Sequence, residues 1–464
     1  MLGRSVAVAL LVLLSASMLQ PALNVKLVLA DDSQRSWEPM IPSPSSSSWP
    51  TFRHDPAHTG YSTSTGPTTN QTLWSYKTGG WVDSNPTVAN GTVYVGSNDA
   101  KVYALNASTG KLLWAYKTVA WSESPAPYYM GSCPTVVGDI VYVGSGETVY
   151  ALNATTGTSQ WNYTTGGTVS SSPAVAVGLV FVDSADTKVY ALNASTGALV
   201  WNDTTGTYEL GSSPAVANGI VYVGSGWPDD RVYALNASTG ALAWSYKTSH
   251  GVYSSPAVEN RIVYVGSDDG NVYALNATTG GRVWNYTTTS NALTGNAVGS
   301  SPAVANGVVY IGSDNDNVYA LNATTGALVW KYKTGNEVDS SPAVANGVAY
   351  VGSEDYNVYA LNTTTGALVW KYATGSFVDS SPAVANGVVY VGSEDDKVYA
   401  FGPVSQRTSY TVLLVVAGVI VIVAIALFIV AVVRRERKRR LPSESALPGS
   451  ENGVKGPQFL FSGS

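Results

Sequence analysis

The chain has 464 residues, enough for one large domain or several small ones. Charged residues make up only 12% of it, and its net charge of −6 already includes the basic run 434–440. The rest of the chain is therefore more acidic than the total indicates, which argues against a nucleic-acid binder with a basic face. Few Glu, Lys and Arg, together with many Tyr and Trp, favour strands and turns over helices.

The N-terminal residues 1–30 have the pattern of an export signal. Arg4 precedes an apolar run at 5–19, which is short for a membrane span. A retained N-terminal membrane anchor is the alternative. Residues 31–48 are rich in Ser and Pro and are predicted to be a linker.

The segment 49–60 contains His54, Asp55 and His58 within five residues. This spacing makes metal binding one interpretation. Pro56, however, breaks any helix that would place both histidines on one face. We predict instead a structural lead-in that packs on the domain that follows.

From residue 71 onward, one pattern recurs with small changes, as in VYALNATTGALVW at 318–330. Its Val-Tyr-Ala core occurs eight times, and successive tryptophans of the pattern lie 40 to 47 residues apart. Such a period is typical of a solenoid or a propeller. In the copy 368–401, strands are predicted at 368–372, 380–385, 388–391 and 397–401, with Asn386-Gly387 as a hairpin turn. Four antiparallel strands in 40 residues predict one propeller blade.

Eight repeats predict an all-β, eight-bladed β-propeller of four-stranded antiparallel blades over residues 49–402. The last repeat lacks an outer strand, and the strand 72–76 around Trp74, which precedes the first repeat, can supply it. That closure ties the two ends together and removes a sheet edge. We expect the propeller to be monomeric.

Seven of the eight repeats carry the spacing Ala-x-Asn-x-x-x-Gly-x-x-x-Trp, for example Ala104, Asn106, Gly110 and Trp114. This pattern resembles the tryptophan-docking motif of the pyrroloquinoline quinone-type (PQQ-like) β-propellers, and the resemblance covers about residues 49–402. It implies that each Trp packs between neighbouring blades, where the small Ala and Gly leave room. The docking residues would be Trp74, Trp114, Trp161, Trp201, Trp244, Trp284, Trp330 and Trp370. The family includes quinoprotein alcohol dehydrogenases and the propeller lipoprotein of the outer-membrane β-barrel assembly machine, so it does not fix a function.

The chain departs from that family by having Asn where Asp is usual, and each such Asn begins an Asn-x-Ser/Thr sequon. We predict N-glycosylation sites at the sequons; the alternative is that Asn serves the turn as well as Asp does. The twelve candidates are Asn70, Asn90, Asn106, Asn153, Asn162, Asn193, Asn202, Asn236, Asn276, Asn285, Asn322 and Asn362.

The resemblance also raises the alternative of a quinone-dependent dehydrogenase. Enzymes of that kind place adjacent cysteines over the quinone, whereas this chain has one cysteine, Cys133, and no Cys-x-x-Cys-His haem motif. Cys133 is predicted to be a small buried residue rather than a reactive thiol. We therefore predict no catalytic residue, no bound metal and no cofactor, PQQ included.

Nearly all length variation between the repeats falls at one end of the predicted blades, which often marks the binding side of a repeat protein. The longer loops and turns there hold aromatic and Met residues, predicted to bind a ligand; packing within the loops is the alternative. They are Trp121, Tyr128, Tyr129, Met130 and Trp227. At the same end Asp83, Asp339 and Asp379 fall in consecutive blades through ring closure. An acidic arc that attracts a cation is one interpretation; solvated charges of near-identical repeats are the favoured one.

After a short linker at 403–410, residues 411–433 are uncharged and almost wholly apolar, which predicts a transmembrane helix. The basic run that opens the tail 434–464 places that side in the cytoplasm. We thus predict a single-pass cell-membrane protein with its propeller outside, binding or scaffolding a protein or glycan partner at the cell exterior. A quinone-dependent dehydrogenase and a cell-surface receptor are the alternatives; no nucleic acid is expected as a partner.

Overall fold

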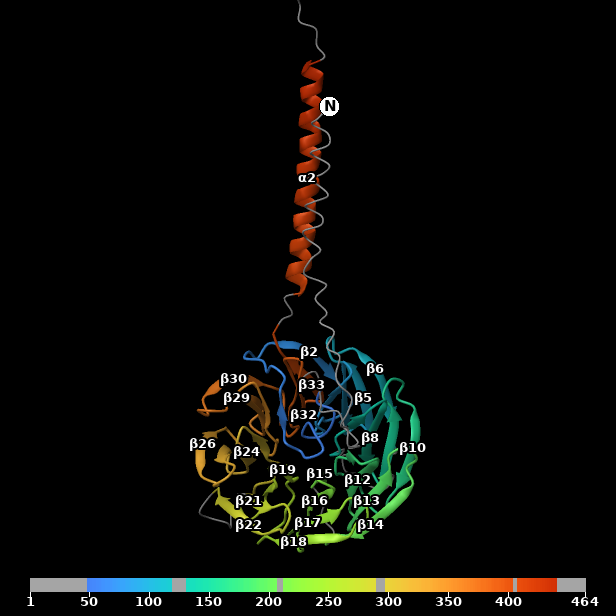
Figure 1. Ribbon diagram of the computed structural model, residues 1–464, viewed down its shortest axis with the longest axis vertical. Helices are drawn as coiled ribbons and strands as arrows, with labels where there is room; N and C mark the ends of the chain where they lie inside the picture. The colour runs from blue at the N-terminus through green and yellow to red at the C-terminus, as the bar shows by residue number, and fades with distance from the viewer. Residues whose placement is uncertain (1–47, 119–130, 207–211, 289–296, 404–406, 440–464) are drawn as a thin grey trace, which may run out of the picture.

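The computed structural model describes residues 48–118, 131–206, 212–288, 297–403 and 407–439. Within these ranges the strands form eight sheets around a common centre, and one long helix follows them (Figure 1). The innermost strands of neighbouring sheets contact each other in a closed circle, β3 meeting both β7 and β31. The predicted eight-bladed β-propeller is confirmed.

Six blades consist of four strands that are consecutive in the chain. The first three, from the innermost strand outward, are β3 (Thr87–Ala89), β4 (Thr92–Ser97), β5 (Lys101–Asn106), β6 (Leu112–Lys117); β7 (Thr135–Val137), β8 (Ile140–Ser145), β9 (Thr148–Asn153), β10 (Ser159–Thr164); β11 (Ala174–Ala176), β12 (Leu179–Ser184), β13 (Lys188–Asn193), β14 (Leu199–Thr204). The next three are β15 (Ala215–Ala217), β16 (Ile220–Gly224), β17 (Arg231–Asn236), β18 (Leu242–Lys247); β19 (Ala257–Glu259), β20 (Ile262–Gly266), β21 (Asn271–Asn276), β22 (Arg282–Thr287); β23 (Ala303–Ala305), β24 (Val308–Ser313), β25 (Asn317–Asn322), β26 (Leu328–Lys333).

The last two blades take a strand from the start of the chain. The eighth combines β31 (Ala383–Ala385), β32 (Val388–Ser393) and β33 (Lys397–Phe401) with β2 (Thr72–Lys77) as its outermost strand. This is the predicted closure, and it leaves no blade short of a strand. The seventh, β27 (Ala343–Ala345), β28 (Val348–Ser353), β29 (Asn357–Asn362) and β30 (Leu368–Ala373), gains β1 (Tyr61–Ser62), which runs parallel to β27.

The blades are held together by two circles of contacts, of which the inner one is a ring of hydrogen bonds. Just before each innermost strand, one backbone N–H donates to a side chain at the equivalent position of the next blade, over 2.5–3.1 Å. The acceptor is a Ser hydroxyl in six blades; Cys133 and Asn85 take its place in the other two. The ring runs through residues 85, 133, 172, 213, 255, 301, 341 and 381 and returns to 85.

The outer circle consists of the eight tryptophans of the repeats. Seven of the indole N–H groups donate to a backbone carbonyl of the neighbouring blade, as from Trp330 to Thr363 over 2.8 Å. A Cβ on Gly366 would come within 2.8 Å of the Trp330 ring, so only Gly fits beneath it. The eighth repeat has no such turn, and Pro67 from the lead-in supplies the carbonyl to Trp370 instead.

The lead-in packs against the propeller from inside the ring. Carbonyls of residues 49–60 accept hydrogen bonds from the central valine of six innermost strands, Val88, Val136, Val216, Val258, Val304 and Val344. Arg53 is fully buried there, and its guanidinium donates to the carbonyls of Pro302 and Pro342. The segment thus satisfies inward-facing backbone groups that would otherwise be left unpaired in the channel.

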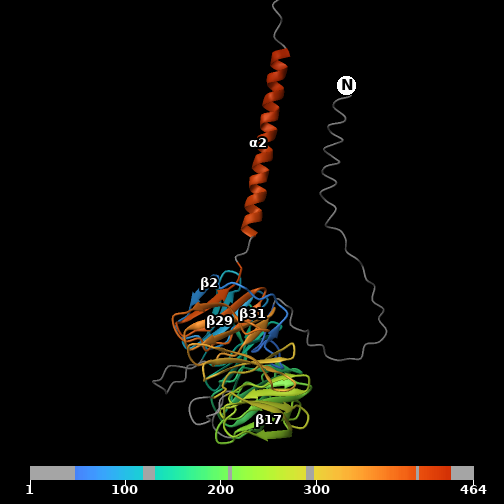
Figure 2. The ribbon, with the colours of Figure 1, turned by 90° about the vertical axis from the view of Figure 1, so that its left-hand side faces the viewer.

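Helix α2 (Arg407–Arg439) follows the propeller, and Figure 2 shows it extending from the side of the ring where β2 lies. In the part of the chain described here, no helix is long and apolar enough to cross a membrane. The predicted span at 411–433 and the single-pass placement that depended on it are therefore wrong. The predicted export signal and most of the tail lie outside the described residues.

Candidate functional site

The two ends of the ring carry different connections. At one end, here the turn end, lie the Asn-Gly turns and the Asn-x-Ser/Thr-Thr-Gly turns; Asn346 and Gly347 have φ values of 49° and 75°, as a tight hairpin requires. At the other, here the loop end, the loop before each innermost strand meets the turn between the second and third strands. The backbone N–H of Glu354, for example, donates to the carbonyl of Glu337.

The predicted aromatic residues are only partly visible at the loop end. Trp121, Tyr128, Tyr129 and Met130 lie outside the described residues. Trp227 is 64% exposed, in the turn between β16 and β17. A second exposed tryptophan, Trp81, also lies at this end, because its carbonyl accepts from the N–H of Asn98 in the neighbouring turn. Sequence reasoning missed Trp81, since its loop has the usual length and gave no signal.

The three predicted aspartates interact across consecutive blades. Burial raises the pKa of Asp379 to about 8, and the charges of Asp339 and Asp83 contribute to the shift. Burial also raises the pKa of Asp83, although one of its carboxylate oxygens accepts a 2.7 Å hydrogen bond from Asn98. The other Asp83 oxygen is shielded from solvent and has no hydrogen-bond partner. The charges of the three aspartates therefore disfavour one another, and an acidic arc that attracts a cation stays a prediction.

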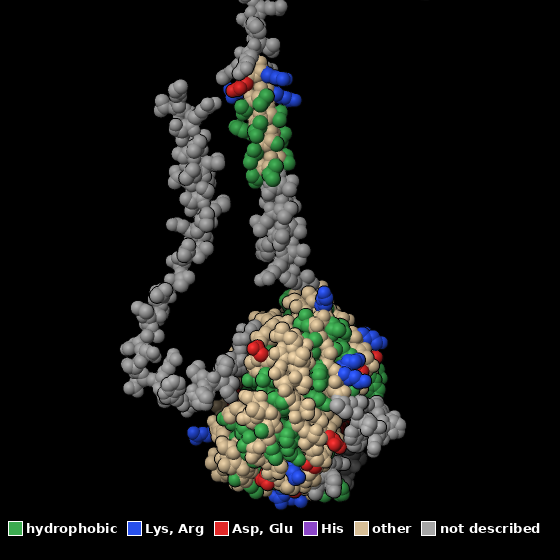
Figure 3. Space-filling view, turned by 90° about the vertical axis from the view of Figure 1, so that its right-hand side faces the viewer, with side chains coloured by type: hydrophobic (Ala, Val, Ile, Leu, Met, Phe, Trp, Pro, Cys, Tyr) green, Lys and Arg blue, Asp and Glu red, His purple; other side chains and the backbone are tan. Residues whose placement is uncertain are grey.

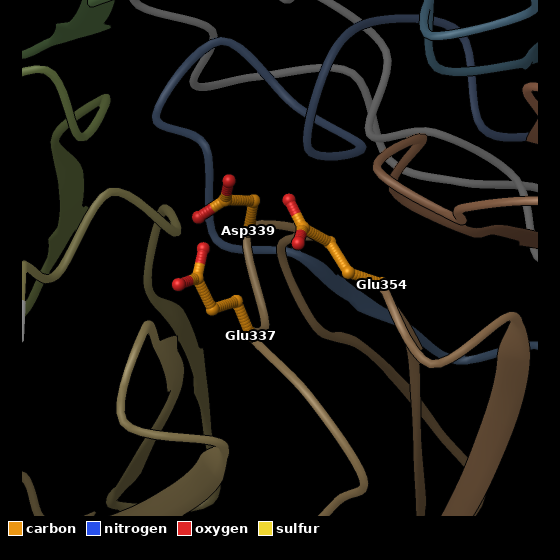
Figure 4. A group of neighbouring side chains, drawn as sticks. All are labelled: Glu337, Asp339 and Glu354. Carbon is orange, nitrogen blue, oxygen red and sulfur yellow. The ribbon is translucent and has the colours of Figure 1, made fainter. Parts of the chain in front are cut away.

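The arc is larger than the sequence indicated, because two glutamates join it in the seventh blade. Carboxylate oxygens of Glu337, Asp339 and Glu354 all lie within 4.8 Å of one another (Figure 4). The side-chain amide of Asn336 donates to Glu354 over 3.1 Å and orients it. Burial, with Asp339 and Glu337, raises the pKa of the neighbouring Asp314 to about 8. Three carboxylates this close could hold a cation. We refer to Glu337, Asp339 and Glu354 as the carboxylate cluster.

Comparison of the repeats shows what is particular to the cluster. Glu354 has an equivalent in Glu394 of the next blade, whose N–H donates to Phe377 as that of Glu354 donates to Glu337. Other blades have Trp81, Thr168, Gly251 or Ala297 where the seventh has Glu337. The signal for Glu337 was thus a variable position within nearly identical copies, which alignment of the repeats reveals.

The lead-in residues that suggested a metal site have structural partners, and Nδ1 of His54 lies 3.7 Å from a carboxylate oxygen of Asp55. His54 packs edge-on against Trp49 and His58 against Phe52. Burial lowers the pKa of His58 to about 3, which keeps its imidazole neutral. Asp55 accepts hydrogen bonds from Thr59. Within the described ranges the carboxylate cluster is the one group whose ligand atoms are close enough to hold a metal ion.

Cys133 is buried within the inner ring of hydrogen bonds. Its thiol accepts from the N–H of Asn85, and burial raises the pKa of the thiol to about 11. The single cysteine therefore serves as a ring member in place of Ser. It does not reproduce the adjacent pair that quinone-dependent dehydrogenases of this fold use.

Comparison with known protein families matches the sequence of the chain to one of them. The family described as "Outer membrane protein assembly factor BamB" matches residues 118–209, 189–337 and 290–413, together more than half of the chain. No curated protein matches the chain.

Solved structures resemble the fold at low sequence identity. BamB from Moraxella catarrhalis is 19% identical with a TM-score of 0.60, covering 72% of this chain and 99% of that one. A europium-containing methanol dehydrogenase is 15% identical with a TM-score of 0.67, covering 78% of this chain and 99% of that one. A quinohemoprotein alcohol dehydrogenase from Comamonas testosteroni is 17% identical with a TM-score of 0.64, covering 78% and 81%. These likenesses show a fold shared by an assembly factor and by enzymes. From its own sequence match, the chain belongs to the BamB family of PQQ-like propeller repeat proteins.

Proposed function

We propose that this propeller is a protein-binding scaffold whose loop end receives a positively charged segment of a partner protein. The observation that carries the proposal is the carboxylate cluster, flanked by the raised-pKa groups Asp314 and Asp379. Carboxylates that repel one another gain from an ammonium or guanidinium group placed among them, because the added charge removes the repulsion. Binding energy is thus available at this end of the channel.

Two further observations support a protein as the occupant. Trp227 and Trp81 are exposed at the same end, and tryptophan is enriched among the residues that dominate protein interfaces. The chain also belongs to a family named for an assembly factor. The lead-in fills the inside of the ring, so a partner segment would enter from the loop end rather than thread through the channel.

No catalytic step is proposed for this site. Its chemistry is that of a cluster of acceptors that offers charge complementarity, and Cys133 is buried away from any reacting group. A glycan partner is one of the outcomes of the test below, because exposed tryptophans also stack on sugars.

The test is affinity capture from the cells that make the protein, using the full chain in three forms: unchanged, Glu337→Gln with Glu354→Gln, and Asp139→Asn. Asp139 is an exposed acid in the turn between β7 and β8, at the turn end, and serves as the matched control. We expect the double variant to lose its partner by at least about tenfold, equivalent to 1.4 kcal/mol. The control should keep the partner, and moderate salt should weaken capture by the unchanged chain.

Identical proteins captured by all three forms would overturn the proposal. So would capture that depends on periodate-sensitive sugars of the partner instead of its basic residues, because the occupant would then be a glycan. Capture lost equally in the Asp139→Asn control would point to the turn end.

A further inference from the structure

Seven turns at the turn end share the sequence Asn-x-Ser/Thr-Thr-Gly and a single geometry. In one of them, Oδ1 of Asn322 accepts hydrogen bonds from the N–H of Thr324 and from the N–H and hydroxyl of Thr325, over 2.9–3.0 Å. The other six turns repeat this set, except that the Thr279 hydroxyl does not reach Asn276. The seven residues are Asn106, Asn153, Asn193, Asn236, Asn276, Asn322 and Asn362.

The turn uses only the oxygen of each asparagine. Among these seven described side chains no Nδ2 makes a hydrogen bond, and all seven are partly or fully exposed. A carboxylate oxygen of Asp would accept the same bonds. The amide nitrogen is therefore a feature that the fold does not require.

The side-chain hydroxyl two positions after each asparagine is a second group that the fold does not require. Thr324 is exposed and contributes only its backbone N–H to the turn, whereas the Thr325 hydroxyl is bound to Asn322. The position of Thr324 holds Ser in three turns and Thr in four. Ser and Thr share the hydroxyl and differ in the methyl group. The residue at this position has therefore changed between repeats while its hydroxyl has been kept, which duplication of the repeat alone does not explain.

These two features together form the acceptor sequence for N-glycosylation, and we infer that the seven turn asparagines are glycosylated. In the transfer, Nδ2 bonds to the anomeric carbon of a saccharide carried on a polyprenyl phosphate or diphosphate. The bond from that carbon to the phosphate oxygen breaks, the phosphate leaves with the electron pair, and Nδ2 gives one proton to a base of the transferase. The reaction takes place outside the cytosol, to which the pattern at residues 1–30 would direct the chain.

Two of the five other sequons differ in that the fold uses their amide. Nδ2 of Asn70 donates to the carbonyl of Lys371, and Nδ2 of Asn285 donates to Asn271, each over 3.0 Å. A sugar on either nitrogen would compete with a hydrogen bond that is already made. The inference concerns the seven turns because they share one geometry; Asn90, Asn162 and Asn202 are exposed sequons outside that set.

The position of the turns gives the sugars a structural consequence. The N–H of Asn322 donates to the carbonyl of Ala327, so this asparagine lies beside the start of β26. Leu328 and Val329, the first residues of that strand, are 44% and 47% exposed. Similar pairs begin other outer strands, and Figure 3 shows hydrophobic side chains along the outer wall of the ring. A sugar at each turn would shield these aliphatic groups from water and from other chains.

The test is mass spectrometry of peptides from the full-length protein, purified from the cells that naturally make it. Peptides that contain the seven turns should carry saccharide mass increments. In the same host, Asn322→Asp and Thr324→Ala should each abolish the increment at position 322, although both keep the acceptors and N–H donors of the turn. Thr325→Ala is the matched control, because it removes the structural hydroxyl and leaves the sequon 322–324 intact.

Unmodified masses at all seven turns of the native protein would overturn the inference. An increment at Asn322 that survives Thr324→Ala would also overturn it, because the modification would then not depend on the sequon hydroxyl. If a variant is not produced in the host, the peptide masses of the unchanged protein still decide the question.

Discussion

The turn end and the loop end of this propeller are built from the same repeats, yet they differ in how closely the repeats agree. At the turn end, seven Asn turns keep one hydrogen-bond pattern, and the Gly of each turn lies against a tryptophan of the preceding blade. At the loop end, the position of Glu337 holds a different residue in each blade compared. The difference shows where packing dictates the residue and where the chain is free to acquire a binding surface.

The largest effect is expected inside the ring, where the lead-in joins the inner strands. Arg53→Ala should lower the free energy of unfolding by on the order of 4 kcal/mol, because the carbonyls of Pro302 and Pro342 lose their donors and a cavity remains. Chemical denaturation of the full chain would measure it. Lys77→Ala, at a side chain that is 68% exposed, is the control and should change stability by less than about 0.5 kcal/mol. Equal effects would show that the Arg53 side chain does not contribute to stability.

A smaller effect should distinguish two glycines of the sixth blade that both have positive φ. Gly326→Ala brings a Cβ within 2.7 Å of Trp284, whereas Gly307→Ala meets nothing within 4 Å. Backbone strain should cost about 1–2 kcal/mol at either position, and overpacking should add about 1–3 kcal/mol at Gly326 alone. Paired denaturation curves measure the difference. If the two variants were equally stable, tryptophan docking would not be what fixes the turn end.

Asp183 is a departure from the repeated sequence that occurs in one blade only. It stands in β12 where the seven other blades have Gly, and burial raises its pKa well above the ordinary 3.8. The folded state thus favours the neutral acid, so stability is greatest below pH 3.8 and falls as pH rises toward the shifted pKa. Asp183→Asn, which keeps an oxygen for the N–H of Ser184, should abolish this dependence.

The measurement for Asp183 is the free energy of unfolding against pH. We expect the Asn variant to match the unchanged chain near pH 3.5 and to exceed it at pH 7 by on the order of 1–3 kcal/mol. Asp139→Asn, at an exposed turn, is the control, and its unfolding free energy should follow that of the unchanged chain at every pH. A gain for Asp183→Asn that is independent of pH would mean that packing, and not ionisation, causes it.

The architecture could be predicted from the sequence because a repeated pattern provides eight observations of one blade. The period near 40, the Asn-Gly turns and the spare strand around Trp74 were enough to predict the ring and its closure. The lead-in was harder to place, since hydrogen bonds that its backbone carbonyls accept leave no side-chain pattern. That Pro67 replaces the missing eighth turn could be seen only once the chain ends were next to each other.

Parts of the candidate site, and the final helix, could not be predicted in the same way. The arc of Asp83, Asp339 and Asp379 followed from equivalence between repeats. Glu337 and Glu354 come from a loop and a turn 17 residues apart, and their proximity depends on the strands between them. The span predicted at 411–433 rested on composition alone, and no helix among the described residues supports it.

The smallest effect is expected at Cys133, where the inner ring accepts more than one side chain. Cys133→Ser should change the free energy of unfolding by less than about 1 kcal/mol, because serine is the acceptor at six equivalent positions. Burial raises the thiol pKa to about 11, so iodoacetamide should modify Cys133 at neutral pH only after denaturation. Rapid alkylation of the folded chain would mean that the ring opens at Cys133. The inner ring would then be weaker at this blade junction than at those closed by serine, and the loop end would differ from the turn end in rigidity as well as in sequence.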